Sequence, residues 1–556
     1  MFANAIAPVA PLTPILPGDR FRSQLWVWFA LGVLVATYLW FVSAWFLNVP
    51  RGDDLGSILP FAEAWREAGG AERFRLLFAQ YFSHRIVGTR LFAIAVDGIF
   101  GHLQLVVFHL FGLGLWLCIV AWFVRRSVQP KHCLFFALVP ALLLLQPAGR
   151  TNLSVAMQSV QNLGVLALGL ASVCLAVRSG RWSFSAALAL GLVAIITSAN
   201  GLIVAPLVSL AAWRTGRRRL AVVGLALWGL CAALYFRGFA ASGVGTRGFS
   251  VLEFATNTLA MLGSPFDLYR LPMSFSIAAG AVLLAAGSGV ILTAFWRRMA
   301  PDPVILFAAF LLASIMLCAA GRMGWGAGYM GQDRYRPYGL LFASCLWIAR
   351  PAVLRSHKAF LTVAVATSAL VAASAYTGLY ANRLEERRWD EAIIVNQRLG
   401  HTMVHEAWHG GASAQARSVA KDIWRPPAGL AGVPSSQFIV SLRSTGDQSA
   451  AGPAHTAMRH EGRGVYVLAS IPPPSAGAEF GVLLLPTGPV LLPALAERNT
   501  YLNMLRGKGL TNRTTQGFLL PVETPPLQSC SLLGLGRSPS GEWRVLWVAP
   551  TLPLAP

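Results

Sequence analysis

The stretch LWVWFALGVLVATYLWFVSAWFLNVPRGDD, residues 25–54, joins an uninterrupted apolar run to two adjacent carboxylates. Residues 25–47 are long enough for one transmembrane helix, which needs about 20 apolar residues. Asp53 and Asp54 follow at the mouth of this span, where an ionised side chain costs a few kcal/mol unless it reaches water or a partner. Their position favours a functional role, whereas an acidic, solvated loop is the simpler explanation of an isolated pair.

The composition is that of a polytopic membrane protein. Of 556 residues, 55% are hydrophobic and only 12% are charged, whereas soluble domains carry about 25% charged residues. The net charge of +22 comes mostly from arginine, and no recognised nucleic-acid module accompanies it, so no nucleic-acid partner is expected. No small-residue cleavage site closely follows the first apolar run, which predicts a retained signal anchor. The absence of a C-x-x-C pair excludes the usual thiol-based metal and redox sites.

Further apolar runs bring the predicted number of spans to eleven. The run at 183–213 is too long for one span and has basic residues at both ends, so we expect a hairpin of two short spans that meet at Asn200 and Gly201. Residues 55–83 have apolar side chains at helical spacing and predict helices on the membrane surface, and 86–100 is expected to be interfacial. The spans after the first are 103–124, 133–147, 157–177, the two halves of 183–213, 220–236, 276–296, 303–320, 339–354 and 359–380.

The distribution of basic residues sets the orientation. Cytoplasmic loops of membrane proteins are enriched in Lys and Arg. With eleven spans and a cytoplasmic N-terminus, all the short basic connections are cytoplasmic, namely 125–131, 178–181, 214–219, 297–298 and 350–358. The chain is therefore expected in a bacterial inner membrane, since its bias toward arginine is typical of a high-GC bacterium. The residues after 380 then lie in the periplasm or outside the cell.

The remaining polar clusters all fall on the outer face, where topology does not explain their arginines. Arginines beside two carboxylates predict a cavity for an anionic group, and guanidinium binds phosphate bidentately. Arg334 and Arg336 are two residues apart, so on an extended segment both side chains point the same way. The clusters are Asp53 and Asp54; His84, Arg85 and Arg90; 147–152; Gln158, Gln161 and Asn162; Asn200; and 321–336.

Two domains are predicted. Residues 1–380 form the membrane domain, with 48–85 as its first external loop, and residues 381–556 form an outer domain. The outer domain begins with a helical pattern at 382–409 and continues with strand-like runs between frequent Pro and Gly; these runs include 464–470, 480–486 and 543–548. The predicted fold class is an α-helical polytopic membrane protein with about 11 transmembrane helices and a C-terminal extracytoplasmic α+β or β-rich domain.

Over roughly residues 20–380 this pattern resembles the GT-C superfamily of polytopic membrane glycosyltransferases. Such proteins carry acidic residues in the first external loop directly after span 1, then surface helices, many spans and often an external C-terminal domain. Its bacterial polyprenyl-phosphate-sugar-dependent branch also has a His-Arg pair in that loop, here His84-Arg85. A late loop reads Gly-Arg and then Ser-Arg-Tyr, here Gly321-Arg322 and Asp333-Arg334-Tyr335. Asp333 departs from the small polar residue expected there.

The resemblance implies sugar transfer from a polyprenyl-phosphate donor to a glycan, lipid or protein acceptor of the cell envelope, on the extracytoplasmic face. An inverting transfer needs a carboxylate base, for which Asp53 is slightly preferred; Asp54 would orient the acceptor or bind a metal. Both are suitable ligands for Mg²⁺ or Mn²⁺, and the sequence leaves metal dependence open. The leaving phosphate needs fixed positive or donor groups; the expected residues are His84, Arg85, Arg322, Arg334 and Arg336.

Further substrate-binding residues are predicted at the outer ends of spans and in the external loops. They are Arg90, Gln161, Asn162, Asn200 and Tyr335. The three amides among them have an alternative role as hydrogen-bonding contacts between helices. His84 has one as an interfacial or capping histidine.

Two other classes of function compete with this interpretation. His405, Glu406 and His409 match H-E-x-x-H, which on a helix places two zinc ligands on one face with a general base between them. This pattern predicts a membrane-anchored zinc metalloprotease, although Gly410 and Gly411 end the helix at once and no third ligand stands out. A lipid or glycan transporter is the other alternative, because broken hairpins occur in transporters, but no inverted repeat is visible.

Overall fold

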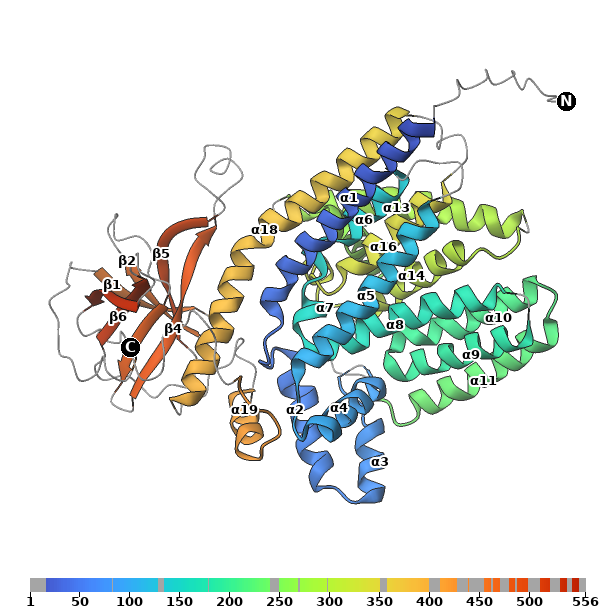
Figure 1. The fold of residues 1–556 in the computed structure, drawn as a ribbon. Coiled ribbons are helices and arrows are strands. Elements are labelled where there is room, and N and C mark those ends of the chain that lie inside the picture. Colours follow the sequence, from blue (N-terminus) through green and yellow to red (C-terminus); the bar gives the residue numbers. More distant parts are fainter. Residues whose placement is uncertain are drawn as a thin grey trace.

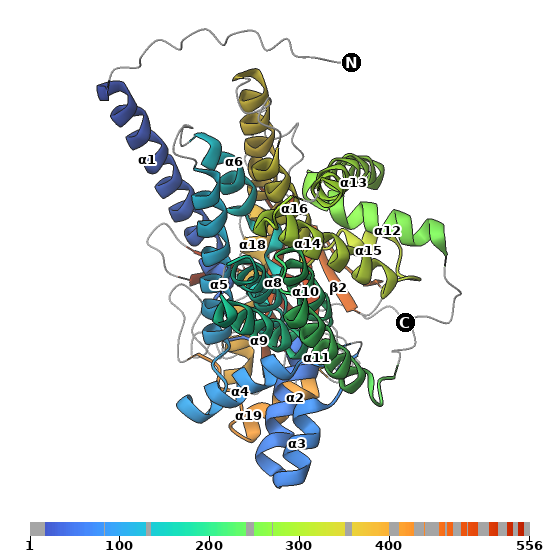
Figure 2. The same ribbon diagram turned by 90° about the vertical axis from the view of Figure 1, so that its right-hand side faces the viewer.

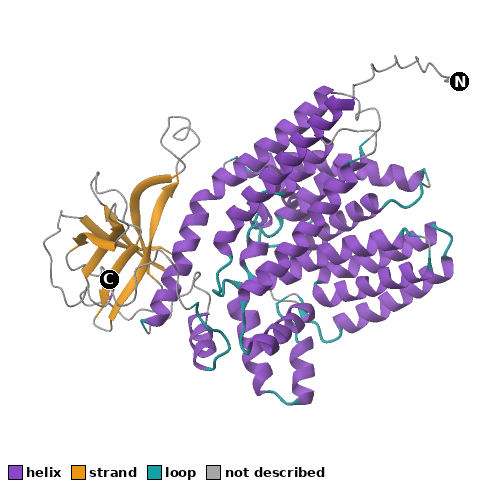
Figure 3. Cartoon of the chain, in the orientation of Figure 1, coloured by secondary structure: helices purple, strands orange, loops and turns teal. Residues whose placement is uncertain are grey.

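The computed structural model describes residues 17–82, 84–128, 135–178, 180–240, 250–268, 271–297, 299–350, 358–399, 411–427 and 439, and seven strands between residues 455 and 549. Helices form the body of the protein, and the strands lie together in the C-terminal tail (Figure 3). The predicted zinc motif at 405–409 lies outside the described residues.

The helical body contains long and short helices in the following order. They are α1 (Pro17–Val42), η1 (Ser43–Trp45), α2 (Asp53–Glu67), α3 (Gly70–Phe78), α4 (Val87–Phe100), α5 (Leu105–Ser127), α6 (Phe135–Leu144), η2 (Pro147–Gly149), α7 (Thr151–Ser154), α8 (Ala156–Ala176), α9 (Arg181–Thr197), η3 (Ala199–Ile203), α10 (Val204–Arg214), α11 (Arg218–Phe236), α12 (Val251–Gly263), η4 (Ser264–Phe266), α13 (Met273–Trp296), α14 (Pro303–Ala320), α15 (Ala327–Met330), α16 (Arg336–Ala349), α18 (Lys358–Arg398) and α19 (Gly411–Ala420).

Seven of the described helices are long and apolar enough to cross a membrane, and they lie in α1, α5, α8, α11, α13, α14 and α18. Their outward faces carry large apolar side chains, such as Trp26, Leu230 and Val282, which are 71%, 57% and 70% exposed. Exposed apolar surface on this scale is unfavourable in water and suits contact with lipid. The chain is therefore a helical, polytopic integral membrane protein. The four other predicted spans form the shorter helices α6, α9, α10 and α16.

The predicted hairpin at 183–213 is confirmed. Helices α9 and α10 are joined by the short 3-10 helix η3, which contains Asn200 and Gly201. A Cβ on Gly201 would lie 2.1 Å from the carbonyl carbon of Ala194, so only glycine permits this return. Residues 86–100, expected to be interfacial, form α4, and Phe92 of α4 packs on Phe111 of α5.

The basic ends of the spans gather on one side of the body. Arg126 at the end of α5 pairs with Asp302 before α14 at 2.9 Å, and Arg217 donates to carbonyl groups at the end of α8. Arg214 of α10 reaches the carbonyls of Phe295 and Met299 at the end of α13. Helices α2, α3 and α4 project beyond the helical body (Figure 2).

Helix α18 connects the body to the tail. It runs beside α1 and continues past the body toward the strands (Figure 1), so the predicted boundary at residue 380 falls inside one continuous helix. Asn396 exchanges two hydrogen bonds of 2.8 Å with the backbone of Leu491, which ties α18 to β4. The strands are β1 (His455–Glu461), β2 (Gly464–Ser470), β3 (Phe480–Leu485), β4 (Gly488–Arg498), β5 (Thr511–Leu520), β6 (Ser531–Arg537) and β7 (Trp543–Ala549), in the antiparallel order β1-β2-β5-β4-β3-β6-β7.

The segment after α18 also returns to the elements that follow α1. The indole N–H of Trp424 donates to the carbonyl of Asn48, and Leu103 N donates to Ile423 O at 2.7 Å. Lys421, just after α19, pairs with Glu63 and Glu67 of α2. Tail residues between Arg417 and Arg425 therefore contact the elements that follow α1.

Candidate functional site

A polar cavity of about 870 Å³ lies at the ends of the helices opposite the basic connections. Its wall is formed by the segments after α1, before α4 and around the start of α8, by the turn at η3, by the loop from α14 to α16, and by α18. The predicted site residues on this wall are Asp53, His84, Gln161, Asn162, Asn200, Arg322, Arg334, Tyr335 and Arg336. Asp54, Arg85 and Arg90 do not line it.

Asp53 faces the cavity from the first position of α2. Gly52 precedes it with φ 47° and ψ −115°, a backbone conformation that favours glycine. The Oδ2 atom of Asp53 accepts a 3.0 Å hydrogen bond from Gln158 Nε2 and lies 3.9 Å from a guanidinium nitrogen of Arg334. Its Oδ1 has no hydrogen-bond partner among the described residues. This oxygen is available to accept a proton from a ligand.

Asp54 has a different role, although it is the next residue. Its side chain is fully buried and accepts hydrogen bonds from the backbone N–H groups of Arg51, Ala156 and Met157 at 3.2, 3.0 and 2.8 Å. Ala156 and Met157 begin α8, so Asp54 caps that helix from another element. Burial raises the pKa of Asp54 to about 7, against the three N–H donors that favour its charged form.

The two carboxylates do not converge on a shared metal position. Both oxygens of Asp54 are occupied by backbone donors, so Asp53 alone of the pair faces the cavity. Groups of three or more His, Cys, Asp or Glu side chains suited to a metal ion do not occur among the described residues. The arrangement does not fit a divalent cation held by the pair, and metal dependence stays an untested prediction.

His84, Arg322 and Arg334 form the electropositive part of the wall. Nη2 of Arg322 lies 3.2 Å from Nε2 of His84. Because guanidinium only donates, Nε2 accepts and the ring proton lies on Nδ1. That Nδ1 atom is buried and has no hydrogen-bond partner in the described part of the chain. Burial, and then the charges of Arg322 and Arg334, lower the pKa of His84 to about 3, so the ring is neutral.

Arg334 lies against aromatic rings on the same wall. Its guanidinium carbon is 4.8 Å from the ring centre of Tyr329 and 5.2 Å from that of Tyr335, and it donates to the Tyr329 hydroxyl. Its Nε is buried without a hydrogen-bond partner in the described residues. Tyr335 in turn accepts from Arg322 at 3.4 Å. The two tyrosines hold both guanidinium groups near the cavity while the ion pair to Asp53 stays long.

The prediction that Arg334 and Arg336 project the same way from an extended segment is wrong. Tyr335 has helical backbone angles, φ −97° and ψ −19°, and α16 starts at Arg336. The two arginines both line the cavity but contact different partners: Arg334 donates to Tyr329, and Arg336 pairs with acidic residues. Arg336 pairs with Asp267 at 2.5 Å and with Asp333 at 3.3 Å and is 5% exposed.

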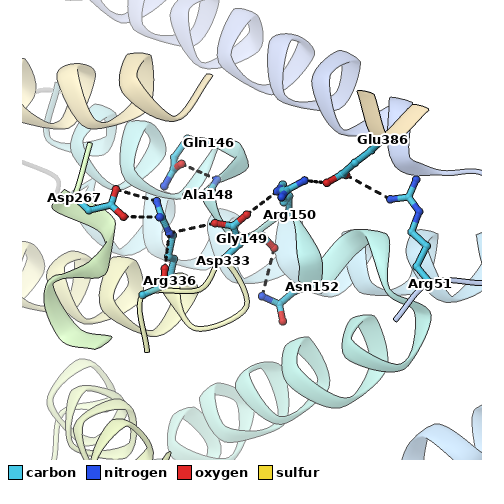
Figure 4. A network of polar contacts seen from close by, with 11 residues as sticks. Arg51, Gln146, Ala148, Gly149, Arg150, Asn152, Asp267, Asp333, Arg336 and Glu386 are labelled. Atoms are coloured by element: carbon cyan, nitrogen blue, oxygen red, sulfur yellow. Dashed lines mark hydrogen bonds and ion pairs between the residues drawn. The ribbon is translucent and has the colours of Figure 1, made fainter. Parts of the chain in front are cut away.

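Arg336 belongs to a chain of alternating charges, which we call the ion-pair chain (Figure 4). Asp333 also pairs with Arg150 at 2.6 Å, Arg150 with Glu386, and Glu386 with Arg51 at 3.7 Å. Arg51 completes the chain at Asp390, to which its Nε donates at 3.0 Å. Its members, in spatial order, are Asp267, Arg336, Asp333, Arg150, Glu386, Arg51 and Asp390. The chain links α18 to the cavity wall, and it explains the acidic Asp333 that the sequence pattern did not expect.

Arg85 and Arg90, predicted to bind substrate, donate to backbone carbonyls behind the cavity. Arg85 reaches the carbonyls of Tyr235 at 2.8 Å and Arg237 at 2.7 Å, and that of Phe78. Arg90 is 7% exposed and donates to the carbonyls of Leu77 and Ala79. These bonds satisfy acceptors at the ends of helices and fix the segment before α4 against the end of α11.

The predicted amides lie on the wall but also bond within the protein. Asn200 donates to the Tyr338 hydroxyl at 2.9 Å, and Asn162 donates to Asn152 at 2.7 Å. Gln161 is 3% exposed. These contacts are consistent with the alternative role of Asn162 and Asn200 as contacts between elements.

Several residues of the wall were not predicted as site residues. Gln158 and Arg150 belonged to polar clusters recognised in the sequence, and this location was the only feature that pointed to the site. No sequence feature pointed to Asp267 or Asn382, since they lie alone in segments far from the predicted loops. Tyr81 was part of the apolar helical pattern of 55–83, and Tyr329 lay inside the recognised cluster 321–336. The additional wall residues that carry polar groups include Tyr81, Arg150, Thr151, Gln158, Asp267, Gln332 and Asn382.

Comparison with protein-family models, curated proteins and solved structures finds no match to this chain. The fold therefore defines the class of protein by itself: a helical integral membrane protein with a polar cavity at the ends of its helices.

Proposed function

We propose that the chain is a glycosyltransferase that moves a sugar from a polyprenyl-phosphate donor to an acceptor on the extracytoplasmic face. The observation that carries this proposal is the pairing, in one cavity, of an available carboxylate oxygen on Asp53 with the guanidinium groups of Arg322 and Arg334. A base beside fixed positive charge suits the attack of a hydroxyl on a carbon that bears a phosphate leaving group.

In the proposed reaction, the acceptor hydroxyl attacks the anomeric carbon from the side opposite the phosphate. The new glycosidic C–O bond forms as the C–O bond to the phosphate breaks, and the configuration inverts. Asp53 Oδ1 takes the hydroxyl proton. The bond electrons leave on the phosphate oxygen, so the lipid phosphate changes from one negative charge to two.

The electropositive wall is suited to that added charge. Arg322 and Arg334 supply positive charge and N–H donors, and the neutral His84 ring supplies the N–H on Nδ1, which the described residues leave unpaired. Donors that are fixed before the reaction stabilise developing charge without the cost of reorientation. Arg336 supports this wall through its ion pairs.

The orientation follows from the charge pattern under the same proposal. The basic ends of the spans lie opposite the cavity, so the positive-inside rule puts them, and the N-terminus, in the cytoplasm. The cavity and the tail then lie in the periplasm of a bacterial inner membrane, with α6, α9, α10 and α16 completing eleven spans. A cell-envelope glycan, lipid or protein is the acceptor class, and the tail is proposed to bind it.

The test is transfer of radiolabelled sugar from a panel of polyprenyl-phosphate sugars by the purified full-length protein, with a cell-envelope fraction as the acceptor source. Transfer that Glu406→Gln leaves intact supports the proposal. The absence of transfer from any donor contradicts it. Zinc that copurifies with a Glu406-dependent proteolytic activity would instead establish the metalloprotease.

A further inference from the structure

Gln158 is the third residue of α8 and lies on the cavity wall, where its side chain touches the proposed base directly. Its Nε2 donates to Asp53 Oδ2 at 3.0 Å. The orientation of the amide is set by chemistry, because a carboxylate accepts and only the NH₂ end of the amide donates. The bond therefore occupies Oδ2 and leaves Oδ1 without a hydrogen-bond partner among the described residues.

The backbone around Gln158 is held by the neighbouring aspartate. Asp54 accepts from the N–H groups of Ala156 and Met157, the two residues before Gln158. Asp53 and Asp54 are thus both bound to the first turn of α8, one through a side chain and one through the backbone. Because Asp54 holds the backbone of this turn next to Asp53, the Gln158 side chain stays within hydrogen-bond distance of Asp53.

The other end of the Gln158 amide argues against a purely structural role. Its Oε1 is buried and has no hydrogen-bond partner in the described residues, although the side chain is 6% exposed. An amide that served only to join helices would be expected to satisfy both ends, because an unpaired buried acceptor is unfavourable. The one hydrogen bond that the Gln158 side chain makes among described residues is to Asp53.

We propose that Gln158 is a positioning residue that holds Oδ2 of Asp53 and thereby presents Oδ1 as the oxygen that takes the proton. The inference rests on the proposed function for its catalytic meaning, while the hydrogen bond itself can be tested without turnover. Arg334 approaches the same Oδ2 at 3.9 Å, and Asp54 and Tyr81 are the other titratable groups close to Asp53. Gln158 is the one among these neighbours that fixes a single oxygen by a direct hydrogen bond.

The experiment measures how fast Asp53 of the full-length protein reacts with a water-soluble carbodiimide and glycinamide near neutral pH, by peptide mass spectrometry. The hydrogen bond from Gln158 occupies one oxygen of the Asp53 carboxyl group, so loss of this bond should speed labelling. Gln158→Met keeps the volume and removes the N–H, and we expect its labelling rate to rise about tenfold. Gln161→Met is the matched control on the same helix and should label Asp53 at the wild-type rate.

Equal labelling rates in the wild type and Gln158→Met would overturn the proposal, as would an equal rise in Gln161→Met. If Gln158→Met is not recovered as folded protein, Gln158→Asn decides, because its shorter side chain withdraws the N–H from Oδ2 and must also speed labelling. In the transfer assay, Gln158→Met should lower kcat with little change in the donor KM. If the wild type transfers no sugar, the proposed function fails while the labelling comparison still decides the role of Gln158.

Discussion

The cavity wall and the layer directly behind it contain the same residue types but use them differently. On the wall, Asp53, Arg322 and Arg334 face the cavity. In what we call the supporting layer, Asp54, Arg85 and Arg90 bond to the backbone. Each of these two sets contains one aspartate and two arginines.

The difference between the two layers lies in their hydrogen-bond partners. Backbone N–H and C=O groups must be satisfied when they are buried, and the supporting layer meets that need for the first turn of α8 and for the ends of α3 and α11. The charged groups of the supporting layer therefore stabilise the fold and do not face the cavity. Asp53, Arg322 and Arg334 bond mainly to other side chains, and a ligand of the right charge can replace those partners.

The largest expected effect separates the two aspartates. Asp53→Asn should lower the rate of sugar transfer by a factor of about 10²–10⁴, since general-base catalysis is worth that much, with little change in melting temperature. Asp54→Asn presents an NH₂ group to a backbone N–H and should lower the free energy of unfolding by about 1–3 kcal/mol. Both variants are compared with wild type in two measurements: the rate of sugar transfer, and thermal unfolding in detergent. The comparison breaks down if Asp54→Asn abolishes transfer in protein that is as stable as wild type.

The next effect separates the arginines. Arg322→Gln removes a positive group from the wall and should lower kcat by about 10²–10³, the range for loss of one donor to a developing charge. Arg85→Gln leaves three backbone carbonyls with weaker partners, so its melting temperature should fall while kcat per folded molecule is retained. Transfer assays with matched amounts of folded protein give kcat for the two variants, and thermal unfolding gives their melting temperatures. A larger loss of kcat in Arg85→Gln than in Arg322→Gln would reverse the assignment.

The smallest effect concerns pH. The pKa of His84 is about 3 in the folded protein, whereas an unfolded histidine titrates near 6.5. Below pH 6.5 the unfolded chain therefore takes up a proton that the folded chain does not, and stability falls with pH until about pH 3. His84→Gln removes this term and should gain about 1–2 kcal/mol over wild type when the pH is lowered from about 7.5 to about 5.

Thermal unfolding of both proteins at the two pH values tests the His84 prediction. The comparison between variants is needed because Asp54 acts in the opposite sense. Its pKa is raised to about 7 in the folded state, so its contribution is present at low pH and is lost as the pH rises through 7. A gap between wild type and His84→Gln that does not change with pH would contradict a buried, neutral ring.

The sequence was sufficient for the helical membrane fold, because apolar runs and basic connections are local signals. The break at Asn200 and Gly201 was also readable, since residues 183–213 were too long for one span. The sequence also predicted that Asp53, Arg322 and Arg334 lie on the same face of the membrane, and all three line the same cavity. It preferred Asp53 to Asp54 only slightly, because adjacent residues have nearly the same location. The backbone N–H groups of Arg51, Ala156 and Met157 that bind Asp54 are visible only in the structure.

The remaining differences have the same cause. Arg85 and Arg90 carry the charge expected of phosphate ligands, but the carbonyls that they satisfy are created by the ends of helices and are not visible in sequence. The turn before α16 separated Arg334 from Arg336 for a similar reason. Asp267 and Asn382 reach the wall from distant segments, and no spacing rule relates them to the first external loop.

The ion-pair chain has a consequence for how the protein is made. Asp390 lies 339 positions beyond its partner Arg51, so most of the spans are synthesised before Glu386 and Asp390 of α18 exist. Until then Arg51 and Arg150 lack two of the carboxylates that pair with them in the finished structure. The ion pairs at the cavity wall are therefore completed only when α18 has been synthesised. A chain that ends before α18 would be inserted in the membrane without the carboxylates of Glu386 and Asp390.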